Sequence, residues 1–314
     1  MKAVRALTLL LLISLVCVST ARGQDTSATN PAVVPPNLLL LVRQEIQYGK
    51  ASARQRLEVA MSLECNRIDV PYSWIELQSL SGPREALFFD PFDSFDQMEE
   101  SIAVWKKIYA AHPELARMQE QIDSLLASEE SIVAVRRDDL GYLADHIDLS
   151  AARFMRVVEV RLLPGHENDF VEGARILADA YDKVRTDTPW VVYQVKMGTQ
   201  SSTFLVFMPM PELRQNDDLL LAEGDLRIAE GEEAARRLQQ ISREAYISTS
   251  SNLYAVSTEM SHMAKDTEPG DAYSGTSNSH VGSNREGAVE TPAPNTGKAK
   301  RKATASKTSG KTQK

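Results

Sequence analysis

The sequence predicts an α+β protein in which one β-α-β-β-α-β unit occurs twice. Sliding the chain along itself by 116 positions superimposes four pairs of distinctive residues: Gly49/Gly165, Trp74/Trp190, Gln78/Gln194 and Gly82/Gly198. Tryptophan occurs only three times in 314 residues, so a register that pairs two of them is informative. Apolar alternation and helical periodicity also follow one another in the same order in both halves.

The second half marks its elements clearly. Residues 156–163 alternate and are rich in Val and Leu, which is typical of a strand, and Pro164-Gly165 ends it. His166 opens a helix with acidic residues in its first turn, and residues 186–189 break that helix. The elements expected next are a strand over 190–197, a strand over 203–208, helices over 212–245 with a break near Gly224, and a strand over 252–258.

The first half gives the same order with weaker signals. The expected elements are a strand over 39–47, a turn at Gly49, a helix over 52–68, strands over 74–80 and 85–89, helices over 93–126 interrupted at Pro113, and a strand over 131–136. Each half is then a split β-α-β unit of the ferredoxin-like kind.

The N-terminus has the pattern of a secretory signal peptide. Lys2 and Arg5 precede an apolar run over 6–18, and small residues at 21 and 23 fit cleavage between Gly23 and Gln24. Later segments lack the roughly 20 continuous apolar residues of a membrane span, so we expect an exported, periplasmic or extracellular protein. A membrane anchor, or lipid attachment at Cys17, is the alternative.

These signals give a domain plan. We expect a signal peptide over 1–23, a linker over 24–37, a first repeat over 38–143, a linker over 144–152, a second repeat over 153–264 and a disordered tail over 265–314. The tail is polar with a basic end, which holds seven basic and no acidic residues over 298–314.

Charge and cysteine content limit the partners. The chain carries a net charge of −8 although its tail is basic, so the folded body is acidic and is not expected to bind nucleic acid. The basic tail is either a solvated segment or a contact for an anionic surface. Cys17 leaves with the signal, so Cys65 has no partner for an intramolecular disulfide, and its apolar helical position predicts a buried core residue.

Three runs of the second half resemble the dimeric α/β-barrel superfamily: 158–170, 189–195 and 203–209. That group includes antibiotic-biosynthesis monooxygenase-like, EthD-like, NIPSNAP-like and chlorite-dismutase-like domains. More narrowly, the chain resembles exported bacterial proteins with tandem domains of the monooxygenase-like and NIPSNAP-like kinds. The resemblance covers most of 38–260 and implies two sheets packed face to face as a barrel. Two copies in one chain imply an internal pseudo-dimer, as a monomer or within a homodimer.

Strand alternation indicates a candidate site. Over 190–197 one face is uniformly apolar and suits packing under helices, whereas the other face is mixed. We expect the mixed faces of both copies to line the barrel lumen, through Trp74, Glu76, Gln78, Trp190, Gln194 and Lys196. The first strands add Arg43 and Glu45 in one copy and, in swapped charge order, Glu159 and Arg161 in the other. If these four face the interior, crosswise Arg–carboxylate pairs would neutralise them.

The leading functional hypothesis is an exported protein that binds a small apolar or aromatic ligand in the lumen, without demonstrated catalysis. The alternative is a purely structural role, in which the same residues only hold the two sheets together. Phosphate loops, metal-ligand spacings and nucleophile elbows are missing from the sequence, so we expect no metal and no cofactor. Two further hypotheses are a cofactor-independent monooxygenase or isomerase with Glu76 or Glu159 as its acid or base, and an interaction module anchored by the basic tail.

Overall fold

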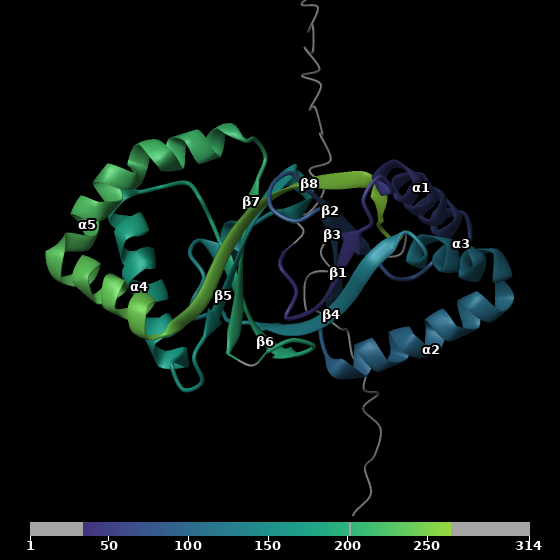
Figure 1. Cartoon of the computed structure of the whole chain (residues 1–314), viewed down its shortest axis with the longest axis horizontal. Coiled ribbons are helices and arrows are strands. Elements are labelled where there is room, and N and C mark those ends of the chain that lie inside the picture. Colours follow the sequence, from purple (N-terminus) through teal and green to yellow (C-terminus); the bar gives the residue numbers. More distant parts are fainter. Residues whose placement is uncertain (1–33, 201, 265–314) are drawn as a thin grey trace, which may run out of the picture. The chain divides into compact units, whose positions relative to one another are not determined.

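The computed structural model describes residues 34–200 and 202–264, which form eight strands and five α-helices (Figure 1). In the first half these are β1 (Leu38–Ile46), α1 (Ala51–Arg67), β2 (Trp74–Ser79), β3 (Glu85–Phe92), α2 (Phe95–Ala111), α3 (Pro113–Asp123) and β4 (Leu126–Arg136). In the second half they are β5 (Phe154–Leu162), α4 (Glu167–Val184), β6 (Val191–Met197), β7 (Thr203–Met210), α5 (Arg214–Glu244) and β8 (Tyr246–His262). The predicted α+β class and the order of elements in each half are confirmed.

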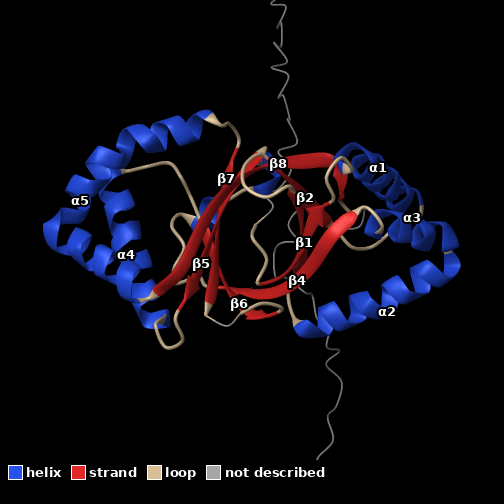
Figure 2. Cartoon of the chain, viewed as in Figure 1, coloured by secondary structure: helices blue, strands red, loops and turns tan. Residues whose placement is uncertain are grey.

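The strands form one closed antiparallel barrel in the order β1-β3-β2-β8-β5-β7-β6-β4. Two seams join the halves, because β2 pairs with β8 and β4 pairs with β6. The helices lie outside the strands, with α1, α2 and α3 over one half and α4 and α5 over the other (Figure 2). The long strand β8 runs along both halves, pairing with β5 through its first part and with β2 through its last (Figure 1).

The barrel interior is filled with apolar side chains. One buried cluster contains residues of all eight strands, as expected for side chains that point inward from a closed sheet: Leu39, Leu41, Leu77, Leu87, Phe89, Ile132, Ala134, Met155, Val157, Val191, Tyr193, Val195, Leu205, Phe207 and Tyr254. Phe89 and Phe207, from opposite halves, meet edge to face with ring centroids 4.7 Å apart. Ile147 and Leu149, from the segment between the halves, belong to the same cluster.

Two differences from the sequence prediction concern element boundaries. The predicted break near Gly224 is wrong, because the non-helical residue of α5 is Gly231, with φ 81° and ψ 162°. The last strand of each half is longer than expected: β4 begins at Leu126 and β8 at Tyr246. Their first parts are polar and exposed and give no apolar alternation. Pairing with β1 and β5 makes them strands.

Cys65 is buried in the cluster beneath α1, as predicted, and burial raises the pKa of its thiol to about 12. The predicted signal peptide and tail lie outside the described residues. Within the residues that the structure describes, no helix is long and apolar enough to cross a bilayer.

The matched glycines hold the hairpin and strand–helix turns. Gly49, Gly82, Gly165 and Gly198 all have positive φ, between 77° and 98°. Gly198 is the most constrained, because a Cβ atom there would lie 2.0 Å from the carbonyl oxygen of Ser131 in β4.

Replacing Gly198 should therefore weaken the β4–β6 seam. We expect Gly198→Ala to lower the free energy of unfolding by about 2–4 kcal/mol, from positive-φ strain plus a backbone clash. Gly165→Ala is the matched control, since its φ is +90° and nothing lies within 4 Å of the added Cβ. Its expected cost is about 1 kcal/mol. Equal losses for the two variants in urea unfolding would contradict the seam argument.

Candidate functional site

The two matched tryptophans lie beneath helices and not in the lumen, so the predicted orientation of the mixed strand face is wrong. Trp190 packs against Tyr142 and Tyr181, and its Nε1 donates to the carbonyl oxygen of Leu140 at 3.1 Å. Trp74 packs against Trp105 of α2, with centroids 6.2 Å apart. In β6 it is the uniformly apolar face, with Val191, Tyr193 and Val195, that fills the interior.

The physical reason is that the closed interior excludes water more completely than the helix-covered faces do, so it takes the purely apolar residues. The remaining members of the mixed face accordingly lie outside the barrel. Gln194 accepts from Lys196 at 2.8 Å, and Lys196 is exposed. Gln78 donates to the Sδ atom of Met260 at 3.6 Å.

The first strands do direct their charged residues toward the interior, and one predicted crosswise pair forms. Arg43 Nη2 lies 2.9 Å from Glu159 Oε2, and Arg43 also contacts Glu85 at 3.5 Å. The second crosswise pair is absent among the described residues, since Glu45 accepts from Ser128 at 3.0 Å and the Nε of Arg161 is buried without an acceptor. Glu159 is thus an ion-pair partner and not a free base.

A cavity lies elsewhere, between the outer face of the first half's strands and helices α1, α2 and α3. It has a volume of about 510 Å³. Its aromatic wall comprises Tyr72, Trp74, Phe88, Phe92, Trp105 and Tyr109, and its polar groups include Gln44, Glu58, Asp90, Ser101, Lys106, Gln119 and Glu129. This volume is in the range of small-molecule sites, and the mixture of aromatic and converging polar groups is typical of them.

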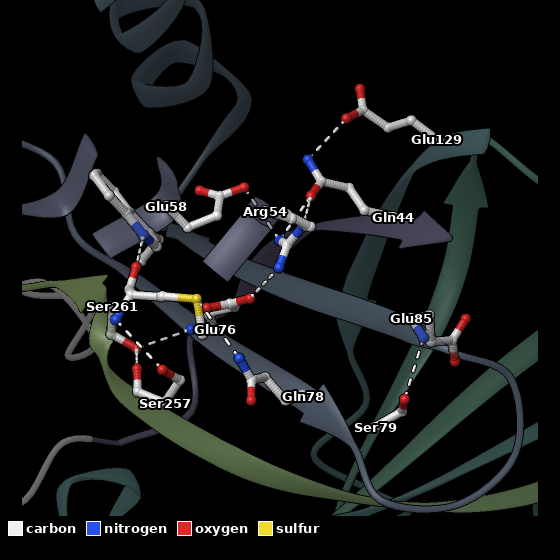
Figure 3. Close-up of polar contacts among 12 residues, drawn as sticks. Gln44, Arg54, Glu58, Glu76, Gln78, Ser79, Glu85, Glu129, Ser257 and Ser261 are labelled. Atoms are coloured by element: carbon white, nitrogen blue, oxygen red, sulfur yellow. Dashed lines mark hydrogen bonds and ion pairs between the residues drawn. The ribbon is translucent and has the colours of Figure 1, made fainter. Parts of the chain in front are cut away.

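A buried guanidinium holds Gln44 and Glu58, two of the cavity's polar residues (Figure 3). Arg54 of α1 is only 1% exposed and lies 2.8 Å from Glu76 Oε1 and 3.1 Å from Glu58 Oε1. Its Nε and Nη2 donate to the side-chain oxygen of Gln44, whose amide donates to Glu129. Every nitrogen of Arg54 is therefore engaged, and its plane also lies over the Phe88 ring, 5.4 Å from the centroid.

One cation serves two buried carboxyls in this network. Burial raises the pKa of Glu58 to about 7, although Arg54 opposes that rise. Burial also raises the pKa of Glu76, whose second oxygen is buried without a partner. Because a lone guanidinium cannot balance two carboxylates, Glu58 holds a proton close to neutral pH. Glu76, predicted as an acid or base, is fully buried behind Arg54 and is not accessible to a ligand.

Asp90 of β3 supplies a second carboxyl at the cavity, on the strand next to Gln44. No hydrogen bond or ion pair to its side chain is found within the described part of the chain, and desolvation raises its pKa to about 7. A carboxyl with these properties, lining an aromatic cavity, is a functional-site candidate.

The other half of the molecule shows that the fold does not need these polar groups. The strand registers align β1 with β5 and β2 with β6 at an offset of 116 residues, and α1 aligns with α4 at the same offset. Strand β3 aligns with β7 at an offset of 118 residues. The counterparts of the polar residues are all apolar: Gln44/Val160, Arg54/Phe170, Glu58/Ala174, Glu76/Val192 and Asp90/Met208. In the second half they form or contact one buried apolar cluster.

Most of these polar residues were not among those predicted from the sequence. Glu76 was among the predicted site residues, but Gln44, Arg54, Glu58 and Asp90 were not. A signal for them existed in the repeat register itself, as charged or polar residues in one copy where the other copy is apolar.

A surface group of possible metal ligands is a weaker candidate. Single atoms of Glu64, His112 and Glu114 lie within 4.8 Å of one another, but Glu64 is already paired with Arg67. Exposed acidic groups of this kind are common without a metal, so we assign none to it.

Known proteins resemble this chain in fold and not in sequence. No family model and no curated protein sequence matches the chain. Among solved structures, an anthrone oxidase-like protein has a TM-score of 0.50 at 12% identity, over 75% of this chain and 96% of that chain. The fold is the dimeric α/β barrel.

Two further barrels have lower scores. An inferred monooxygenase from Lactobacillus acidophilus NCFM has a TM-score of 0.43 at 8% identity, over 72% of this chain and 96% of that chain. A mutant chlorite dismutase from Candidatus Nitrospira defluvii has a TM-score of 0.43 at 9% identity, over 73% and 95%. Identities this low concern the fold and assign no activity to the barrel described here.

The two cavity carboxyls should make the barrel less stable as the pH rises. Their folded pKa values, about 7, exceed the ordinary values of 4.5 and 3.8, so the folded chain binds these protons more tightly than the unfolded chain. That stabilisation is complete below about pH 4 and is lost as the pH rises through about 7. Each carboxyl should lower the free energy of unfolding by up to about 1.4 kcal/mol per pH unit over this range. We expect the double variant Glu58→Gln, Asp90→Asn to lose this pH dependence.

The measurement is urea unfolding of both proteins between about pH 5 and pH 8. His262 acts in the opposite direction, because burial lowers its pKa, but it is present in both proteins and cancels in the difference. Parallel stability curves would show that neither carboxyl is perturbed.

Proposed function

We propose that this protein binds a small, partly aromatic molecule in the cavity between the strands of its first half and helices α1, α2 and α3. The proposal keeps the ligand class expected from the sequence and moves the site from the lumen to the helix-covered face. The single observation that carries it is the difference between the halves. One copy packs this layer with apolar residues, and the other keeps a buried charge network and a cavity of about 510 Å³ in the same place.

The physical argument is that a buried ion-pair network is a poor way to stabilise a layer that apolar packing would hold. Replacing such networks with apolar residues is often neutral or stabilising. This chain contains the apolar solution in its second half, at the counterparts of Arg54, Glu58 and Glu76. Retention of the polar version in the first half is therefore best explained by a ligand.

Filling the cavity should weaken ligand binding without unfolding the barrel. Ser101 lies on α2 and lines the cavity, so Ser101→Phe projects a ring into it. Ala103→Phe is the matched control, since Ala103 is on the same helix and exposed. We expect at least a roughly tenfold loss of affinity for any ligand found by native mass spectrometry or by Trp fluorescence screening with aromatic compounds, about 1.4 kcal/mol. Equal binding by both variants would place the ligand elsewhere.

A second candidate is a cofactor-independent oxygenase or isomerase that begins by removing a proton from carbon. Asp90 favours it, because an accessible carboxyl with a pKa of about 7 suits a general base at neutral pH. Glu58, on the same cavity, is available to return a proton.

The proton-transfer step can be tested without oxygen. An anthrone is the probe, because it has an acidic methylene group and one fold neighbour is an anthrone oxidase-like protein. Under anaerobic conditions in D₂O, the wild-type protein should accelerate deuterium incorporation into the methylene, followed by NMR. Asp90→Asn should lose about 100-fold or more of that acceleration. Rates equal to those of buffer alone would exclude this candidate for anthrones.

We further propose export, from the signal-like pattern over 1–23, and a monomer in which the two halves form the pseudo-dimer. Every strand of the barrel already has two neighbours within one chain, which supports the monomer. An interaction role for the basic end at 298–314 stays a prediction, because that segment lies outside the described residues.

A further inference from the structure

The charged groups that face the cavity are predominantly acidic. They are Glu58 from α1, Asp90 from β3, Glu129 from β4 and Lys106 from α2, together with the phenols of Tyr72 and Tyr109. Lys106 and Glu129 are exposed to solvent, whereas Glu58 is buried and Asp90 is half-buried. The inner part of the cavity is thus lined by two carboxyls and no free cation.

Arg54 does not change this balance. Its three guanidinium nitrogens are directed at Gln44, Glu58 and Glu76, so none is available to Asp90 or to a ligand anion. In the inner part of the cavity, an anionic ligand would meet two carboxyls and no free cation.

The aromatic wall complements a positive charge. Trp74 and Trp105 lie with centroids 6.2 Å apart, Tyr109 follows Trp105 at 5.5 Å, and all three rings line the cavity. Ring faces attract cations, by about 2 kcal/mol or more where water is excluded. Phe88, part of the same wall, already carries the Arg54 guanidinium 5.4 Å from its centroid.

We propose that the ligand of this cavity is a small organic cation with apolar or aromatic substituents, a protonated aryl amine or a quaternary ammonium, held between Asp90 and the Trp74–Trp105 wall. This inference rests on the ligand-binding function proposed above. The cation would supply the partner that Asp90 lacks within the described chain, and its apolar substituents would fill the aromatic part of the cavity.

A matched pair of probes separates charge from shape. Phenyltrimethylammonium and tert-butylbenzene have nearly the same size and differ by one positive charge. With the full-length protein at pH 8, we expect the cation to bind at least roughly tenfold more tightly by Trp fluorescence titration, equivalent to about 1.4 kcal/mol. Asp90→Asn should remove that preference, whereas Glu99→Gln, an exposed charge change on α2 outside the cavity, should retain it.

Proton release gives a second readout that needs no variant. The pKa values of Glu58 and Asp90 are about 7, and a bound cation stabilises their ionised forms. Calorimetry near pH 7 in two buffers of different ionisation enthalpy should therefore show protons released on binding of phenyltrimethylammonium. Its affinity should rise between about pH 6 and pH 8.

The binding of the two probes separates a failure of the cation proposal from a failure of the proposed ligand-binding function. Equal or tighter binding of tert-butylbenzene, without proton release, would overturn the proposal of a cationic ligand. The cavity would then remain a site for neutral aromatic molecules, which favours the oxygenase or isomerase candidate. If neither probe binds at millimolar concentration, the proposal of a cationic ligand is overturned. The result would also count against the cavity as a binding site for molecules of this size.

Discussion

Closure of the eight-stranded sheet is the constraint on which the rest of the structure depends. A closed antiparallel barrel leaves no free strand edges, and its inward side chains are shut off from water. Most of these are therefore apolar, with Phe89 and Phe207 meeting across the centre. Among the inward charges, Arg43 pairs with Glu159 at 2.9 Å. A filled interior leaves no room for a ligand, which is why the proposed site is on an outer, helix-covered face.

The two outer faces solve the same packing problem differently. In the second half Phe170 stacks on Phe204 with centroids 4.1 Å apart, within a buried apolar cluster under α4 and α5. In the first half the counterpart of Phe170 is Arg54, which needs Glu58, Glu76 and Gln44 to satisfy it. Removing one member of such a network leaves uncompensated buried charge, at a cost of about 3–5 kcal/mol. The network therefore constrains its own residues tightly, and this keeps Glu58 at the cavity with a raised pKa.

Much of the fold was predictable from the sequence, whereas the site was predictable only in part. Gly49 and Gly165 gave the turns, and the swapped charges of the first strands predicted the Arg43–Glu159 pair. Alternation shows which residues share a face but not which face is interior, since closed barrels and helix-covered sheets both select apolar residues. Trp74 and Trp190 were placed in the lumen for that reason. Arg54 and Glu58 were missed because charged residues on a helix normally indicate its solvent side.

The last strand explains why both halves belong in one chain. The end of β8, from the second half, holds two residues of β2 on the first half's outer face: the Met260 carbonyl accepts from Trp74 Nε1 at 2.8 Å, and Ser261 Oγ accepts from the Glu76 backbone N–H at 2.9 Å. At the corresponding seam β4 pairs with β6. In a dimer of identical units, any change at one such seam would appear at both. With the two units in one chain, one outer face can keep the apolar packing that stabilises the barrel while the other gives up packing for a cavity with ionisable groups.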